Sequence, residues 1–317
     1  MKCRVLILIG IFCLAFHTAF AQQTQLRFAT SLSSSTGHVY GAGIASLVNK
    51  YSSKVQISAF ATAGVVENDR LLRNNNAQIA MHGSGQVINS YNGLGNYKGK
   101  PFSNLRLLWN AYPVHLNFIV PANSSIRSID QFKRKKFGTG NAGSTTFVQV
   151  EDVLKAYGFS YKDLTVRPLS LNEQVAALKD GNIDGFGTLM GANTPALVDL
   201  ALSKPVRWLS IPDDIWNKIK TQFPKGFYSR SVIPAGTYPG QNEDVKTIAS
   251  MNMWVTTSDV PDDVVYEILK IFWDHKAEAD SIHPIIKETP TIIVEADSPI
   301  PLHPGARRYL AEKGMLK

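Results

Sequence analysis

Short hydrophobic runs alternate with amphipathic stretches along the first third of the chain. The hydrophobic runs are rich in β-branched residues and predict strands at 26–30, 55–59, 78–82 and 105–111. Helices are predicted between them at 40–52 and 65–75. In the first of these helices, Ile44, Leu47, Val48 and Tyr51 recur with the spacing of a single helix face. This alternation predicts a first α/β lobe.

The same alternation starts again after residue 135. Strands are predicted at 136–139, 165–169, 183–189 and 206–211, and helices at 144–157, 172–179, 195–203 and 213–223. A repeated strand, helix, strand order favours parallel sheets that are covered by helices on both faces. We therefore predict a second lobe of the same α/β class.

Two extended stretches are suited to connect the lobes. Residues 114–121 are apolar, and residues 228–239 are interrupted by Pro234, Gly236 and Pro239. A strand at 247–256 and one long helix at 261–282 follow. The predicted division is 22–116 for lobe 1, 117–232 for lobe 2, and 233–317 for the return crossover, the remainder of lobe 1 and the C-terminal helices. A cleft is expected between the lobes, at the carboxyl ends of the strands.

The first 21 residues have the pattern of a secretory signal peptide. Lys2 and Arg4 precede an apolar stretch at 5–16, and Ala19-Phe20-Ala21 forms a small-x-small cleavage site. This apolar stretch is shorter than the roughly 20 residues that a membrane-spanning helix needs. We predict Sec-dependent export, cleavage after Ala21 and a periplasmic mature protein.

Composition excludes several classes of protein. The chain is 44% hydrophobic and 18% charged, which is typical of a folded protein rather than of a disordered or collagen-like one. Its formal net charge is +8. Both cysteines, Cys3 and Cys13, lie in the predicted signal peptide. The mature chain therefore has no thiol for a disulfide, a metal site or catalysis.

Motifs of enzyme chemistry are absent from the sequence. There is no H-E-x-x-H, G-x-S-x-G or P-loop, and Gly41-Ala42-Gly43 lacks the third glycine of a dinucleotide-binding fingerprint. The histidines lack metal-binding spacing, and the acidic pairs stand near helix starts, where the helix dipole favours them. The basic run at 133–136 has no interleaved aromatic residues. We expect no catalytic residue, no metal, no cofactor and no nucleic-acid partner.

Three loops at predicted strand ends are rich in glycine and small hydroxyl residues. They cover residues 31–37, 61–64 and 141–146, and each leads into a predicted helix. Free N–H groups at a helix start, with Ser or Thr hydroxyls beside them, bind a carboxylate without a buried Lys or Arg. Simple helix capping explains each loop taken alone. Their occurrence in both lobes favours an anion site.

The sequence resembles the TAXI-type solute-binding proteins of tripartite ATP-independent periplasmic (TRAP) transporters. The resemblance rests mainly on the motifs I-P-A-G-T-Y-P-G-Q at 233–241 and P-L-H-P-G-A-R-R-Y at 301–309, and it covers essentially all of the mature chain. It implies a two-lobe periplasmic binding protein of the type II arrangement, with a central cleft and hinge strands. It also implies a small organic anion as ligand, such as glutamate or 2-oxoglutarate, and TRAP membrane permease subunits as partners. The loops at 33–36 and 82–86 depart from the usual family pattern.

We predict that the protein is a monomer and that its two lobes close around the ligand. Its carboxylate would be held by the helix start at Gly143, Ser144 and Thr145 and by the loop containing Ser34, Ser35 and Thr36. Further polar or stacking partners are expected among the residues His38, Tyr40, Asn68, Ser84 and Tyr238.

Two alternative functions use the same fold. A periplasmic sensor would present the closed lobes to a receptor kinase rather than to a permease, and the sequence does not separate this function from transport. An enzyme on the same fold would need a nucleophile and a base, and the sequence offers no evident pair.

Overall fold

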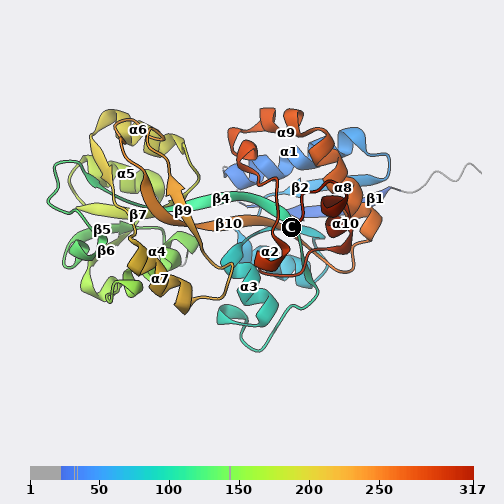
Figure 1. The fold of residues 1–317 in the computed structure, drawn as a ribbon, viewed down its shortest axis with the longest axis horizontal. Coiled ribbons are helices and arrows are strands. Elements are labelled where there is room, and N and C mark those ends of the chain that lie inside the picture. Colours follow the sequence, from blue (N-terminus) through green and yellow to red (C-terminus); the bar gives the residue numbers. More distant parts are fainter. Residues whose placement is uncertain (1–22, 32, 34, 143) are drawn as a thin grey trace, which may run out of the picture.

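The computed structural model describes residues 23–317, with the exception of residues 32, 34 and 143. The predicted signal peptide at 1–21 therefore lies outside the described residues. Two lobes are arranged side by side and joined by two long strands (Figure 1). The two-lobe α/β architecture predicted from the sequence is confirmed.

Lobe 1 begins with the predicted alternation of strands and helices. Its elements are β1 (Thr24–Ala29), α1 (Thr36–Tyr51), β2 (Val55–Phe60), α2 (Val65–Arg73), β3 (Ile79–Gly83), α3 (Ser84–Asn92) and the short η1 (Gly95–Tyr97). The strands β2, β1 and β3 pair in parallel. Helix α3 was not predicted, because Gly83 and Gly85 obscure the start of its short helical pattern.

Lobe 2 has helices on both faces of its strands. Its elements are η2 (Ile129–Phe132), β5 (Lys136–Thr139), α4 (Thr145–Ala156), η3 (Tyr161–Asp163), β6 (Thr165–Pro168), α5 (Leu171–Lys179), β7 (Gly185–Met190), α6 (Pro195–Ser203), β8 (Val206–Trp208), α7 (Asp213–Gln222) and β9 (Ser229–Ile233). One core packs beneath α4 and α7, and a second packs beneath α5 and α6. The strands β7, β5 and β6 are parallel, as predicted.

Two strands belong to both lobes. These are β4 (Leu105–Pro121) and β10 (Val245–Thr257), which run antiparallel to each other and make one mixed sheet in the order β2-β1-β3-β10-β4-β7-β5-β6. The sequence predicted separate stretches at 105–111 and 114–121, but Pro113 does not end β4. Its missing N–H is tolerated beside a register shift in the ladder. The limits at residues 116 and 232 stay a prediction.

The chain ends on lobe 1 with α8 (Asp262–Asp274), α9 (Lys276–Ile282), η4 (Pro284–Glu288), η5 (Glu295–Asp297) and α10 (Pro304–Glu312). The single helix predicted at 261–282 was wrong, because the backbone bends at His275, with φ −112° and ψ 30°. Both resulting helices pack against α1. The lobe 1 core centres on Trp254. The centroid of its ring lies 4.3 Å from that of Phe28 and 5.0 Å from that of Tyr40.

Candidate functional site

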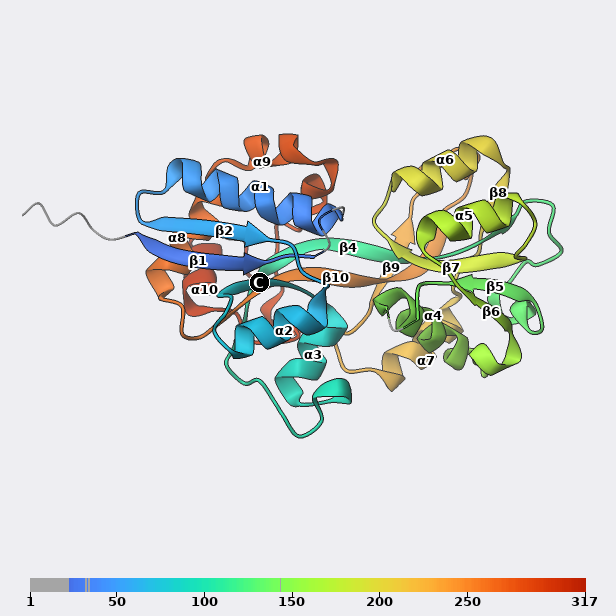
Figure 2. The ribbon, with the colours of Figure 1, turned by 180° about the vertical axis from the view of Figure 1, so that it is seen from behind.

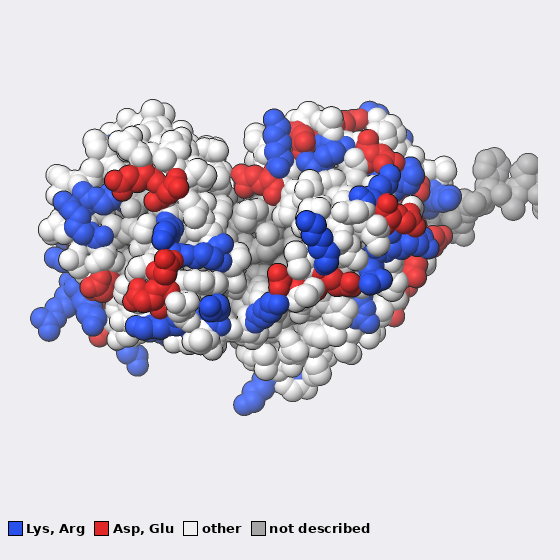
Figure 3. Space-filling model, viewed as in Figure 1, with Lys and Arg blue, Asp and Glu red and all other residues white. Residues whose placement is uncertain are grey.

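A groove separates the two lobes, and acidic side chains border its upper end and basic side chains its lower end in Figure 3. Helix α1 follows the carboxyl end of β1, and α4 follows the carboxyl end of β5. The view from behind shows the beginning of each helix directed toward the gap between the lobes (Figure 2). The sequence predicts an anion site at these two helix starts, and this site stays a prediction.

Helix α1 begins with a capped first turn. The Ser35 hydroxyl accepts a hydrogen bond from the His38 amide at 3.2 Å, so Ser35 is the N-cap and Thr36 is the first helical residue. The His38 ring is held by a 2.8 Å contact between its Nδ1 and Thr30 Oγ1. Within the described residues, the amides of Thr36 and Gly37 have no acceptor. The predicted partner Ser34 lies outside the described residues.

Helix α4 begins in the same way in lobe 2. The Ser144 hydroxyl accepts from the Phe147 amide at 3.1 Å, and Thr145 is the first helical residue. The amides of Thr145 and Thr146 have no acceptor among the described residues. The predicted residue Gly143 lies outside the described part of the chain. Each lobe thus contributes a helix start whose first N–H groups have no acceptor among the described residues.

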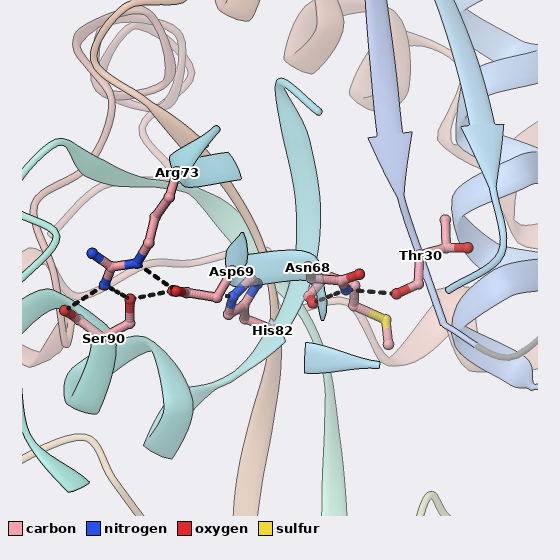
Figure 4. Close-up of polar contacts among 7 residues, drawn as sticks. Thr30, Asn68, Asp69, Arg73, His82 and Ser90 are labelled. Atoms are coloured by element: carbon pink, nitrogen blue, oxygen red, sulfur yellow. Dashed lines mark hydrogen bonds and ion pairs between the residues drawn. The ribbon is translucent and has the colours of Figure 1, made fainter. Parts of the chain in front are cut away.

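Asn68 holds lobe 1 together. Its side-chain amide donates to the Thr30 carbonyl and to the Met81 carbonyl, both at 2.7 Å, and its Oδ1 accepts from the Thr62 hydroxyl at 2.7 Å. Figure 4 shows this link between the end of β1 and β3. The side chain is fully buried. Its hydrogen-bonding groups are therefore occupied, and we remove Asn68 from the residues proposed to contact a ligand.

Ser84 also has a structural role at the junction of the lobes. Its hydroxyl donates to the Phe227 carbonyl at 2.8 Å and accepts from the Met251 amide at 3.3 Å. Beside it, a Cβ on Gly85 would lie 2.6 Å from the Phe227 ring, so only glycine allows α3 to approach this closely. Ser84 joins α3 to lobe 2 and to β10, and we remove it from the proposed contacts.

Tyr40 lies in the core rather than in the groove. Its side chain is fully buried, and its hydroxyl pairs with the Thr289 hydroxyl at 2.6 Å. Burial raises the pKa of Tyr40 to about 12, so the hydroxyl is neutral. We therefore assign Tyr40 a packing role in place of the predicted ligand contact.

Replacing Tyr40 with phenylalanine tests this role. We expect Tyr40→Phe to lower the free energy of unfolding by about 1–2 kcal/mol, because the Thr289 hydroxyl loses its buried partner. Urea denaturation measures this change. Any stabilisation by ligand should be the same as in the unaltered protein, and its disappearance would return Tyr40 to the binding site.

Tyr238 packs in the lobe 2 core beneath α5 and α6. Its ring stacks on Trp208 at 4.6 Å and is fully buried. Its hydroxyl makes no well-formed hydrogen bond within the described residues, although the Asn193 backbone lies near enough to moderate its pKa. Burial raises the pKa of Tyr238 to about 12. Tyr238 was predicted as a polar or stacking partner of the ligand, but its ring stacks on Trp208. Only its hydroxyl is left for another group.

A buried polar network lies next to Asn68 and was not predicted from the sequence. Asp69 accepts from Arg73 Nε at 2.5 Å and from the Ser90 hydroxyl, and Arg73 Nη2 donates to that hydroxyl at 2.9 Å (Figure 4). His82 Nε2 lies 4.0 Å from Asp69 Oδ1, and neither ring nitrogen is hydrogen-bonded within the described residues. Burial lowers the pKa of His82 to about 4, so the ring is neutral at pH 7. This network ties α2 to α3.

A pocket of about 460 Å³ lies where both lobes meet the hinge strands. It is lined by apolar side chains of α7 and β10, among them Trp216 and Met251, and by the C-terminal segment from Pro290 to Pro299. None of the predicted binding residues lines it. No pattern in the sequence predicted this pocket, because its walls come from four distant segments of the chain, including β4 at Asn110.

Neither a membrane-crossing helix nor a metal-binding cluster is found among the described residues. No helix in this part of the chain combines the length and the apolar character needed to cross a membrane. No group of three or more His, Cys, Asp or Glu side chains gathers there as a metal site.

Known proteins with a similar fold are two-lobe binding proteins. The chain is similar to PhnD1 from Prochlorococcus marinus in complex with methylphosphonate, with a TM-score of 0.56 and 11% identity over 92% of this chain and 98% of that one. It is also similar to XAC2383 from Xanthomonas citri bound to ATP, with a TM-score of 0.52 and 12% identity over 91% and 94% of the two chains. A third similar structure concerns glutathione import by GshT and the cystine ABC importer TcyBC of Streptococcus mutans. Its TM-score is 0.51, with 13% sequence identity over 84% of this chain and 97% of that one.

At identities this low, the structural similarity establishes the fold alone. The sequence pattern of the NMT1-like family matches residues 28–314, which is nearly all of the described chain. The protein therefore belongs to the NMT1-like family and has the α/β fold of two-lobe solute-binding proteins.

Proposed function

We propose that the protein captures a small organic anion between its lobes in the periplasm and delivers it to a membrane transport system. The observation that carries this proposal is the pair of helix starts at Ser35 and Ser144, one from each lobe. Free amides and the positive ends of helix dipoles favour a carboxylate. Because the donors come from both lobes, bound ligand stabilises the closed state. Micromolar binding needs about 8 kcal/mol, which is within reach of a few charge-assisted hydrogen bonds and burial of the ligand.

We further propose a TRAP permease as the recipient and glutamate or a related acid as the ligand. The resemblance of residues 233–241 and 301–309 to TAXI proteins supports this choice. Uptake by cells that express the protein with its permease should continue when ATP is depleted and an ion gradient is kept. Uptake that needs ATP hydrolysis would contradict the TRAP assignment and leave anion capture intact.

A thermal-shift panel on the mature chain tests capture itself. Amino acids, dicarboxylates and keto acids are added at about 100 times the expected Kd, where a bound ligand raises the melting temperature by on the order of 5 °C. Ser144→Phe should abolish the shift, because the large ring would block the α4 helix start.

The matched control is Ser160→Phe. Ser160 also caps a helical turn of lobe 2, but η3 precedes β6 and so stands at the opposite end of the strands. Both variants lose a cap worth about 1 kcal/mol, so each is compared with its own melting temperature without ligand. A full ligand shift in Ser144→Phe would show that the pocket lies elsewhere.

A further inference from the structure

Glu288 is a half-buried carboxylate at the end of η4. No ion pair or hydrogen bond of its side chain is formed with the described residues, whereas the nearby surface residue Glu278 pairs with Lys50 at 2.8 Å. Burial raises the pKa of Glu288 to about 6, and no neighbouring cation opposes this effect. A half-buried carboxylate without a cation beside it is stabilised by any donor that water or a bound ligand supplies.

The surroundings of Glu288 come from both lobes and from the hinge. Burial is the main cause that raises the pKa of Tyr112 on β4 and of Tyr238 in lobe 2, and the charge of Glu288 adds a smaller contribution in the same direction. In lobe 2, the loop after β7 reaches η4, because a Cβ on Gly191 would lie 3.0 Å from Ile285 Cδ1. Glu288 therefore stands at the meeting point of the lobes.

The same position is fixed relative to the helix start of α1. Thr289 follows Glu288 directly, and its hydroxyl pairs with Tyr40 in the second turn of α1 at 2.6 Å. Helix α1 and η4 are in contact. A ligand whose carboxylate is held at the start of α1 thus has Glu288 nearby on the same lobe.

Two orphan groups point to the chemistry of the missing partner. Glu288 offers acceptors only, and the Tyr238 hydroxyl is fully buried without a well-formed hydrogen bond in the described chain. A primary ammonium group provides three donors, carries the compensating charge and is attracted to aromatic faces. A second carboxylate would be repelled by Glu288. These observations favour a ligand that carries both a carboxylate and an ammonium group.

We propose that Glu288 forms an ammonium subsite in the groove, with the Tyr238 hydroxyl beside it, and that the ligand is an amino acid rather than a dicarboxylate. This inference rests on the proposed capture of an organic anion between the lobes. The Glu288 carboxylate would select amino acids from among anions of similar size.

Isothermal titration calorimetry at pH 7.5 with matched pairs of acids tests the subsite. Each pair has the same carbon skeleton and differs in the amino group: glutamate and 2-oxoglutarate, alanine and pyruvate, leucine and 4-methyl-2-oxopentanoate, phenylalanine and phenylpyruvate. We expect the amino acid of the binding pair to bind about 100-fold more tightly than its keto acid. Glu288→Gln should weaken the amino acid by about 30-fold or more and leave the keto acid within about 3-fold.

The control variant is Glu278→Gln, in the preceding helix α9, where the carboxylate is a surface group paired with Lys50. It should keep the preference for the amino acid. Circular dichroism establishes that each variant is folded. A keto acid that binds as tightly as its amino acid, or a preference that survives Glu288→Gln, would overturn the subsite while anion capture stands. Failure of every acid to bind the unaltered protein would overturn capture together with the subsite.

Discussion

Replacing Asp69 with alanine is expected to lower the free energy of unfolding by about 3–5 kcal/mol. The Asp69 side chain is only 2% exposed, and it accepts hydrogen bonds from Arg73 and Ser90. Its removal leaves the Arg73 guanidinium without its partner, between α2 and α3. Because Arg73 is one quarter exposed and lies 4.5 Å above the Phe102 ring, water and the aromatic face offset part of the loss. The lower end of the range is therefore expected.

Urea denaturation of two further variants makes this prediction specific. Asp69→Asn keeps an acceptor for Arg73 and Ser90 and should lose only about 1–2 kcal/mol. Asp199→Ala removes a carboxylate that pairs with Lys179 at 2.9 Å but is 71% exposed, and it should change the stability by less than about 1 kcal/mol. Equal losses for Asp69→Ala and Asp199→Ala would show that the network does not hold lobe 1 together.

His82 is expected to make the protein less stable as the pH falls from about 6.5 to about 4. Burial lowers the pKa of His82 to about 4 in the folded protein, while Asp69 opposes the shift. The unfolded chain therefore takes up this proton first, at a pKa near 6.5. The contribution of neutral His82 to the free energy of unfolding is fully present above pH 6.5. About 3 kcal/mol of it is lost as the pH falls to the pKa of the folded state. Below it, both states carry the proton and this contribution does not change further.

A variant without the imidazole separates this effect from other titrations. Because the pKa of Glu288 is raised, protonation of Glu288 stabilises the folded protein as the pH falls over part of the same range. The pH dependence of the unaltered protein alone therefore does not isolate the effect of His82. Chemical denaturation of the unaltered protein and of His82→Leu is compared at several pH values. The difference between the two curves should change by about 3 kcal/mol between pH 6.5 and pH 4. Parallel curves would contradict the assignment.

Much of the fold was predictable because it depends on local periodicity. The strand and helix patterns of both lobes were identified, since apolar positions at spacings of two and of three to four mark each element independently. The errors occur where distant segments decide the conformation. Pro113 stays within β4 because β10 accommodates it with a register shift, and the bend at His275 lets α8 and α9 both pack on α1. No local pattern encodes either outcome.

The candidate site was less predictable, because the role of a polar residue depends on its partners. The loops that contain Ser35 and Ser144 were recognisable as leading into helices from their glycine and hydroxyl residues, although the first helix begins at Thr36 rather than at residue 40. Asn68 and Ser84 have the same types of side chain, but they bind backbone groups from distant strands and loops. Glu288 was missed for the opposite reason: the sequence does not show which of many acidic residues lacks a partner.

The sharing of β4 and β10 limits how this protein can be re-engineered. A chimaera in which one lobe comes from a different relative needs two junctions, one inside β4 and one inside β10. Both junctions fall in buried ladders rather than in exposed loops, and a frame error of one residue would invert the inward and outward positions of everything beyond it. Recombination of specificities in this fold is therefore governed by strand register, and points such as Met251 opposite Pro113 define where an exchange must be aligned.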